Sequence, residues 1–179
     1  MRRLILLRHA KTESDAPSGK DHDRRLDDRG REDAAAIGGW LIGQQLRPEL
    51  VLVSSAVRAQ QTWAIVGDQI PADAPQPNVA HLAELYSATP ATMLGILREV
   101  PGHPQLILLI GHNPGLHELA LGLSCSKGGT EHKPLPGNMP TAAVAVIDFA
   151  IKHWGDASFG GGRLTQYMTP KLLKAPHGH

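Results

Sequence analysis

An arginine and a histidine stand side by side at Arg8 and His9, directly after the apolar run Leu4–Leu7. We interpret this run as a strand, and ligands of open α/β sheets bind beyond the carboxyl ends of the strands. Arginine offers a rigid fork of N–H donors that suits phosphate, and a neutral imidazole can act as nucleophile, base or metal ligand. The pair is therefore a candidate site for phosphoryl transfer, although an Arg-His pair after a strand also arises by chance.

A second arginine follows a second apolar run. The run Leu50–Val53 leads through Ser54 and Ser55 into a predicted helix, with a serine as its N-cap and Arg58 in its first turn. Taken alone, Arg58 could be an ordinary solvated arginine of a helix. Its position beside a strand end makes it a candidate second ligand of the same phosphate.

A second histidine, His112, follows a third apolar run, Leu106–Ile110. Asn113 is predicted to cap the next helix and Pro114 to occupy its first position. Taken alone, His112 could be a hydrogen-bonded histidine beneath a loop. Because the N–H groups and the dipole at helix starts favour an anion, we expect both arginines and both histidines to converge on one phosphate-sized site.

Apolar runs and helical patterns alternate along the chain, which is typical of an α/β fold. Strands are predicted near residues 3–8, 50–54, 79–82, 106–111, 142–149 and 163–168. Helices are predicted near residues 28–46, 56–70, 90–100 and 113–124. Asp27 or Asp28 is expected to cap the first helix, and Thr89 with Pro90 to open the third. The segment 126–140, rich in glycine, proline and lysine, is predicted to be a loop.

The composition is that of a compact soluble enzyme. With 179 residues and 41% hydrophobic content, one domain is expected. A net charge of only +1 gives no broad basic face, so nucleic acid is not an expected partner. The single cysteine, Cys125, suits a reducing compartment, and no apolar run is long enough for a signal peptide or a membrane span. We therefore expect a cytoplasmic protein without membrane contact.

These motifs together resemble the histidine phosphatase superfamily. Its signature is Arg-His after the first strand, an arginine after the second and a histidine after a later one, which here are Arg8, His9, Arg58 and His112. The chain is similar to the small bacterial branch, the SixA-type phosphohistidine phosphatases, in the segments 24–30, 53–62, 111–115 and 140–143. It departs from the common pattern at Ala10, where many members have glycine, and at Arg25, where proline is common.

The resemblance implies a fold and a domain organisation. We expect a single-domain α/β three-layer sandwich with a mostly parallel central sheet, phosphoglycerate mutase-like, without a large lid insertion. Residues 1–174 would form the histidine phosphatase domain, and residues 175–179 a C-terminal tail. The sequence leaves the oligomeric state open.

The resemblance also implies a two-step mechanism without a metal or other cofactor. His9 would attack phosphorus to form a phosphohistidine, which water then hydrolyses. Arg8, Arg58 and a protonated His112 would bind the phosphoryl oxygens, and Arg24 would complete the pocket. The ten histidines are scattered, and the spacing of His112 and His117 does not suit an i, i+4 metal pair.

The sequence gives weaker indications of the proton donor and of the substrate. Glu84, after the third predicted strand, lies where the superfamily often keeps its acid, but it could equally be a solvated carboxylate. The short segment between Arg58 and His112 leaves little room for a covering lid, which favours phosphohistidine on a signalling protein as the substrate. The alternatives are a phosphomonoesterase for small metabolites, a mutase and a phosphate-binding regulatory module without turnover.

Overall fold

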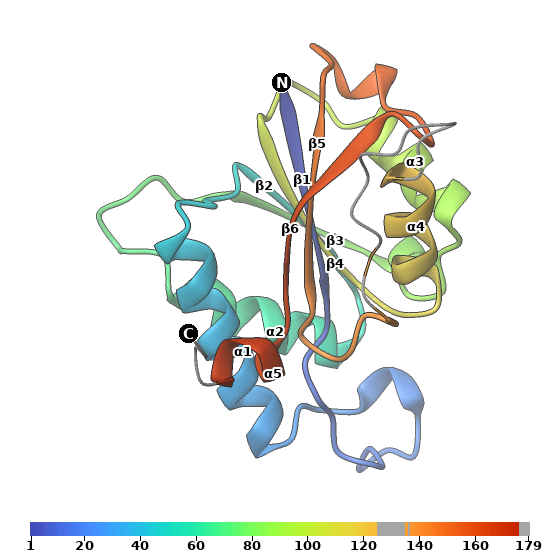
Figure 1. Ribbon diagram of the computed structural model, residues 1–179. Coiled ribbons are helices and arrows are strands. Elements are labelled where there is room, and N and C mark those ends of the chain that lie inside the picture. Colours follow the sequence, from blue (N-terminus) through green and yellow to red (C-terminus); the bar gives the residue numbers. More distant parts are fainter. Residues whose placement is uncertain (125–134, 136, 176–179) are drawn as a thin grey trace.

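Six strands form one sheet in a computed structural model that describes residues 1–124, 135 and 137–175 (Figure 1). The strand order is β3-β2-β4-β1-β5-β6. Neighbouring strands run parallel from β3 to β1, and β5 runs antiparallel to both of its neighbours. The strands are β1 (Arg2–Arg8), β2 (Leu50–Ser54), β3 (Asn78–Leu82), β4 (Leu106–Gly111), β5 (Val144–Phe149) and β6 (Gly162–Met168). The predicted mostly parallel α/β sheet is confirmed.

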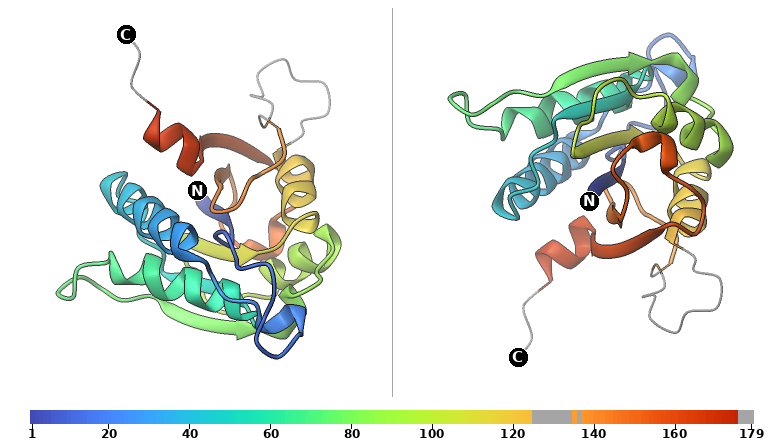
Figure 2. Two further views of the ribbon diagram at one scale, coloured as in Figure 1. Left: turned by 90° about the horizontal axis from the view of Figure 1, so that it is seen from below. Right: turned by 90° about the horizontal axis from the view of Figure 1, so that it is seen from above.

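Helices cover both faces of this sheet. Helices α1, α2 and α5 lie on one side and α3 and α4 on the other (Figure 2). The α-helices are α1 (Asp28–Gly43), α2 (Val57–Asp68), α3 (Pro90–Arg98), α4 (Gly115–Ser124) and α5 (Pro170–Lys174). Short 3₁₀ helices are η1 (Asp21–Asp23), η2 (Ala83–Leu85) and η3 (Trp154–Asp156). The result is the single-domain three-layer sandwich that the sequence predicted.

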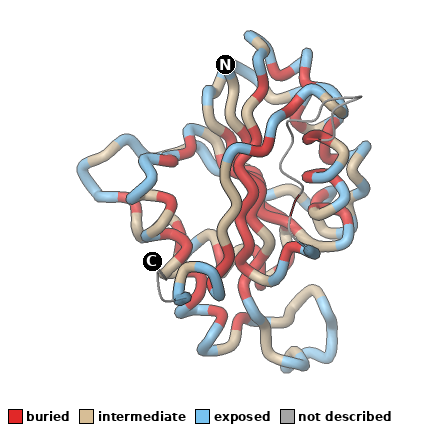
Figure 3. Tube along the Cα trace, viewed as in Figure 1, coloured by how far each residue is buried: buried red, intermediate tan, exposed pale blue. Residues whose placement is uncertain are grey.

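The continuous apolar runs read from the sequence are strands buried on both faces. Leu4 and Leu6 of β1 pack into the cluster under α3 and α4, whereas Ile5 and Leu7 pack into the cluster under α1 and α2. All four side chains are fully buried, and the central strands are the most buried part of the molecule (Figure 3). A parallel strand covered by helices on both faces is apolar throughout, which is why these runs do not alternate with polar residues.

Two predicted helix caps are confirmed, and the starts of two other helices differ from the prediction. Asp27 caps α1 by accepting from the N–H of Gly30, and Thr89 caps α3, as expected. The predicted serine cap of α2 is wrong, because its N-cap is Ala56, without a side-chain cap bond. Helix α4 begins one residue later than expected, at Gly115.

The C-terminal part contains a helix that the sequence analysis did not predict. Helix α5 has the usual start signal, since the Thr169 side chain accepts from the N–H of Leu172 and Pro170 follows the cap. Lys174 in this helix bonds the buried carboxylate of Asp33 in α1 at 2.9 Å, which fastens the end of the described chain to the first helix.

Some sequence predictions concern residues that the structure does not describe. Cys125, most of the predicted loop 126–140 and residues 176–179 of the predicted tail lie outside the described residues. Within the described part of the chain, the helices are all too short or too polar to cross a membrane.

Candidate active site

The carboxyl ends of β1, β2 and β4 meet at one edge of the sheet, as their parallel pairing requires. Arg8 at the end of β1 is in register with Gly111 of β4, and His9 and His112 come directly after these two residues. The two imidazole rings lie with their centroids 5.2 Å apart. Ser54, the last residue of β2, contacts Nε2 of His112 through its hydroxyl at 2.7 Å. The two predicted histidines are therefore neighbours at this edge.

The two predicted arginines join this cluster from different elements. Arg58 is buried in the first turn of α2, and Arg8 donates to the carbonyl oxygen of Met139 at 3.1 Å. Burial lowers the pKa of Arg8, and the positive charge of Arg58 lowers it further. Two guanidinium groups that repel each other in a partly buried place make a site that favours an anion.

Three buried nitrogen atoms of this cluster lack hydrogen-bond partners in the described part of the chain: Nε of Arg8, Nε of Arg58 and Nδ1 of His112. Buried polar atoms in folded proteins are nearly always bonded. The charged guanidinium groups of Arg8 and Arg58 are both close enough to His9 to lower the pKa of its ring. Buried nitrogen atoms beside a histidine that have no protein partner among the described residues can bond the oxygens of a phosphoryl group.

The surroundings of His9 keep its imidazole ring neutral. Its Nδ1 lies 2.8 Å from the carbonyl oxygen of Ala10, and since a carbonyl only accepts, Nδ1 carries the proton and Nε2 keeps its lone pair. Burial lowers the pKa of His9 to about 3, although the bond to Ala10 opposes this shift and nearby positive charges add to it. The ring is therefore uncharged at neutral pH.

The surroundings of His112 in this structure favour its neutral form, and the protonated His112 expected for phosphoryl binding stays a prediction. Burial lowers its pKa to about 4, and Arg58 contributes to the shift. The sequence could not show this, because the effect depends on how deeply the ring is enclosed beside the arginines. A phosphoryl dianion at the site would raise the pKa of His112 again.

Two segments fix the backbone that carries His9. The buried hydroxyl of Thr62 in α2 accepts from the N–H of Ala10 at 3.0 Å and donates to the carbonyl oxygen of Arg58 at 2.7 Å. On the other side, the N–H of Ala142 is shared between the carbonyl oxygens of Arg8 and His9, at 3.1 and 3.0 Å. The strand end is thus tied both to α2 and to the motif 140–143.

Two side chains that the sequence analysis missed join the site: Asp21 from the loop between β1 and α1 (residues 9–27), and Tyr86 from the segment after η2. Asp21 bonds Arg58 through its carboxylate at 3.1 Å and through its carbonyl oxygen at 2.8 Å. Tyr86, just after η2, donates its hydroxyl to Asp21 and sets its ring edge-on to His112, with centroids 5.5 Å apart. The sequence signal for Tyr86 was its place in a loop beside a strand end. Its pairing with Asp21 could not be predicted, because the two residues are 65 positions apart in the chain.

Arg24 and Glu84, two further predicted residues, lie outside this cluster. Arg24 bonds the carboxylate of Asp21 at 2.9 Å and the hydroxyl of Thr12 at 3.1 Å, so it reaches the site only through Asp21. Glu84 is exposed in η2, and its carboxylate has no hydrogen bond or ion pair within the described residues. Phosphate binding by Arg24 and proton donation by Glu84 stay predictions.

A hollow of about 290 Å³ adjoins His112 on the side of α3 and α4. Gly115 shapes its floor, because a Cβ atom there would lie 2.1 Å from the carbonyl oxygen of Ala88. The residues that line the hollow are Tyr86, Ser87, Ala88, Thr89, His112, Asn113, Pro114, Gly115 and Glu118. It offers room for the group that carries a phosphoryl.

Known proteins resemble this chain in sequence and in fold. The sequence pattern of the histidine phosphatase superfamily (branch 1) matches residues 4–87. An uncharacterized protein of Mycobacterium tuberculosis is 34% identical over 169 residues, which cover 92% of this chain and 100% of that protein. The chain belongs to the histidine phosphatase superfamily. Membership of this superfamily supports phosphatase activity.

Two solved structures place the protein in the SixA-type branch of this superfamily. The putative phosphohistidine phosphatase SixA from Agrobacterium tumefaciens has a TM-score of 0.75 and 28% identity, covering 94% of this chain and 99% of that one. The protein histidine phosphatase SixA complexed with tungstate has a TM-score of 0.71 and 26% identity, covering 96% and 99% of the two chains.

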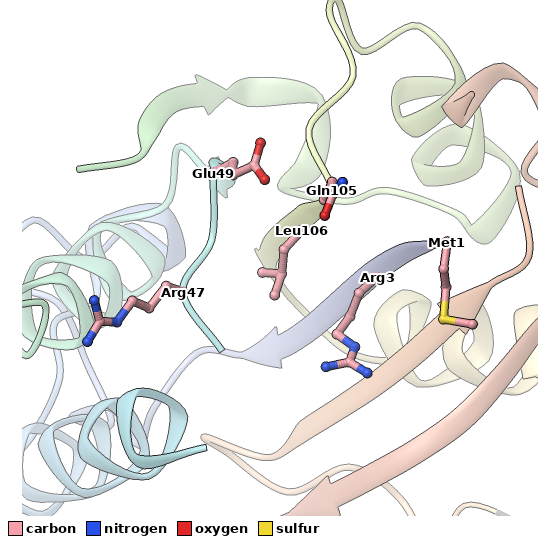
Figure 4. A pocket seen from close by; sticks show the side chains of 6 residues that line it. All are labelled: Met1, Arg3, Arg47, Glu49, Gln105 and Leu106. Carbon is pink, nitrogen blue, oxygen red and sulfur yellow. The ribbon is translucent and has the colours of Figure 1, made fainter. Parts of the chain in front are cut away.

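A second hollow of this histidine phosphatase lies at the opposite edge of the sheet, away from His9 (Figure 4). Its lining residues are Met1, Arg3, Arg47, Glu49, Gln105 and Leu106. Arg3 is already bonded to the carboxylate of Asp148 at 2.6 Å, which leaves it less free to bind an anion. This hollow holds neither of the two site histidines, and the candidate active site is the edge that carries them.

Proposed function

We propose that this protein is a metal-independent phosphatase that removes phosphate from phosphohistidine on a signalling protein, through a phosphohistidine formed on His9. The observation that carries the proposal is the set of buried nitrogen atoms on Arg8, Arg58 and His112 that have no partner among the described residues and lie beside a neutral imidazole. These groups supply a nucleophile and a cradle for phosphoryl oxygens in one place.

In the first step, Nε2 of His9 attacks phosphorus in line with the leaving group. A P–N bond forms to His9 while the bond to the leaving group breaks, and the leaving group takes a proton. Arg8, Arg58 and His112 hold the three remaining oxygens, whose charge they stabilise in the transition state. The proton on Nδ1 stays on the ring, held by the carbonyl oxygen of Ala10.

In the second step, water attacks the phosphorus of phosphorylated His9. The P–N bond breaks, the electron pair returns to Nε2, and inorganic phosphate leaves after the water proton is lost to solvent or to a phosphate oxygen. The same arginines stabilise the charge in this step. The two guanidinium groups supply the positive charge, which is the basis for proposing that no metal ion takes part.

The surroundings of the site favour a phosphoramidate carried by another protein as the substrate. The hollow beside His112 is open, so a phosphorylated side chain on another protein can enter it. A departing imidazole can be protonated from solvent, which agrees with the lack of contact between Glu84 and the described residues of the cluster. Both solved relatives above are named as phosphatases of phosphohistidine or protein histidine, and tungstate, an oxyanion shaped like phosphate, binds one of them.

A turnover comparison tests the proposal. We expect phosphohistidine on a small signalling domain to be hydrolysed with a kcat/KM at least about tenfold above that for p-nitrophenyl phosphate and sugar phosphates. The same activity should persist in EDTA, whereas loss in EDTA and recovery with a divalent ion would show that a metal takes part. Higher kcat/KM for small phosphate esters would favour a general phosphomonoesterase instead.

A further inference from the structure

Asp21 lies at the centre of a network that joins α2, the segment after η2 and its own loop. Its Oδ2 atom accepts from Arg58 at 3.1 Å and from the Tyr86 hydroxyl, and its Oδ1 atom accepts from Arg24 at 2.9 Å. Its carbonyl oxygen accepts from Arg58 at 2.8 Å. A single residue of η1 thus holds side chains from α2, from the loop after η2 and from its own loop.

The two contacts with Arg58 leave a particular part of its guanidinium free. Both terminal nitrogens, Nη1 and Nη2, donate to Asp21, whereas Nε is buried without a partner among the described residues. Asp21 therefore holds the two terminal nitrogens of the Arg58 guanidinium by hydrogen bonds, and the Nε–H is left for a ligand. An arginine held in this way has already lost much of the side-chain freedom that it would otherwise lose on binding an anion.

The negative charge of Asp21 also suits a residue that holds Arg58 in place. The hydrogen bond from Tyr86, together with Arg58 and Arg24, lowers the pKa of Asp21 to about 2, although partial burial opposes the shift. The carboxylate is thus ionised at neutral pH, and its side chain is 54% exposed at the rim of the site. Its negative charge offsets part of the repulsion between Arg58 and Arg8.

We propose that Asp21 is a positioning residue that fixes Arg58 and Tyr86 around the phosphoryl-binding site, so that oxyanion affinity depends on a carboxylate that does not itself bind the anion. The inference rests on the proposed phosphoryl site but not on the identity of the substrate. The opposing view is that Asp21 is an internal competitor that occupies Arg58 until a phosphoryl group displaces it. The two views predict opposite effects of removing the carboxylate charge.

Tungstate affinity, measured by calorimetry, separates these views. We expect Asp21→Asn to weaken tungstate binding about tenfold, because Arg58 loses its charged anchor. Asp23→Asn is the matched control, since Asp23 lies in the same 3₁₀ helix and bonds Ser18 and His22 but no arginine in the described structure. It should change the affinity by less than about twofold, and thermal unfolding should show both variants to be folded. Unchanged affinity in Asp21→Asn would overturn the proposal, and tighter binding would establish the competitor.

A double-mutant cycle shows whether the effect passes through Arg58. In an Arg58→Ala background, with tungstate at millimolar concentration, Asp21→Asn should weaken binding far less than in the wild-type protein. An equal loss in both backgrounds would mean that Asp21 acts only by general stabilisation of the fold and would refute the positioning role. Asp21→Glu should restore part of the affinity. Because tungstate needs no turnover, these results stand even if phosphohistidine proves a poor substrate.

Discussion

At the scale of single residues, the site depends on which nitrogen of His9 carries its proton. The carbonyl oxygen of Ala10 fixes that proton on Nδ1, and burial keeps the ring neutral, so the lone pair of Nε2 is available at neutral pH. A buried imidazole beside two guanidinium groups is a costly arrangement for the fold, since the ring forgoes protonation that it would have in water. The proposed role of His9 as a nucleophile would account for that arrangement.

Replacement of this nucleophile gives the first prediction. We expect His9→Ala to lower kcat by about 10⁴-fold or more and to abolish the acid-labile phosphoenzyme, because no other group in the site replaces its lone pair. His81→Ala, at an exposed position of the edge strand β3, is the control and should retain activity. Single-turnover kinetics with a phosphorylated substrate measure both variants. Near-normal turnover in His9→Ala would contradict the proposed mechanism.

The protonation of His112 is a second prediction at this scale. The pKa of its ring is lowered to about 4 by burial and by Arg58, and a bound dianion should raise it, so that binding takes up a proton near pH 6.5. Calorimetry of tungstate binding in buffers of different ionisation enthalpy measures this uptake. His112→Gln should reduce the uptake to near zero. If proton uptake is the same in that variant, the proton goes to another group.

At the scale of elements, much of the site could be predicted because catalytic residues follow buried strands. The runs that became β1, β2 and β4 are apolar on both faces, and Arg8, His9 and His112 stand at their ends. Asp21 and Tyr86 could not be found in this way, because their contact joins a loop to a distant segment without a periodic pattern. Sequence periodicity locates elements, whereas side-chain pairing between loops depends on the tertiary fold.

Thr62 gives a prediction at the scale of elements, because its hydroxyl connects α2 with the segment after β1. Thr62→Val keeps the shape but leaves the N–H of Ala10 without its acceptor, so we expect a loss of about 1 to 3 kcal/mol in the free energy of unfolding. Activity should fall as well, since Ala10 holds the ring of His9. Thr92→Val, at an exposed position of α3, should cost less than about 0.5 kcal/mol. Urea unfolding measures both, and equal losses in the two variants would refute the linking role of Thr62.

At the scale of the whole molecule, the sandwich brings two buried ionisable side chains, His9 and Arg58, together at one edge of the sheet. The helices that cover both faces make the strands an apolar layer, and at its carboxyl edge the buried His9 and Arg58 lie beside the partly buried Arg8 and His112. The stability of the whole fold is therefore coupled to the protonation of its active site. The lowered pKa values of the two histidines determine whether the free energy of unfolding rises or falls with pH.

The last prediction follows from the lowered pKa values of His9, about 3, and His112, about 4, against an ordinary value of 6.5. Between pH 6.5 and about pH 4 the unfolded chain binds protons on both histidines while the native protein does not. The free energy of unfolding therefore falls as the pH is lowered through this range, by up to about 1.4 kcal/mol per pH unit for each histidine. Urea unfolding at a series of pH values measures the slope. His112→Gln should reduce it and His81→Ala should not, because His81 is exposed. A slope that is the same in His112→Gln and the wild-type protein would show that His112 is protonated in the native state.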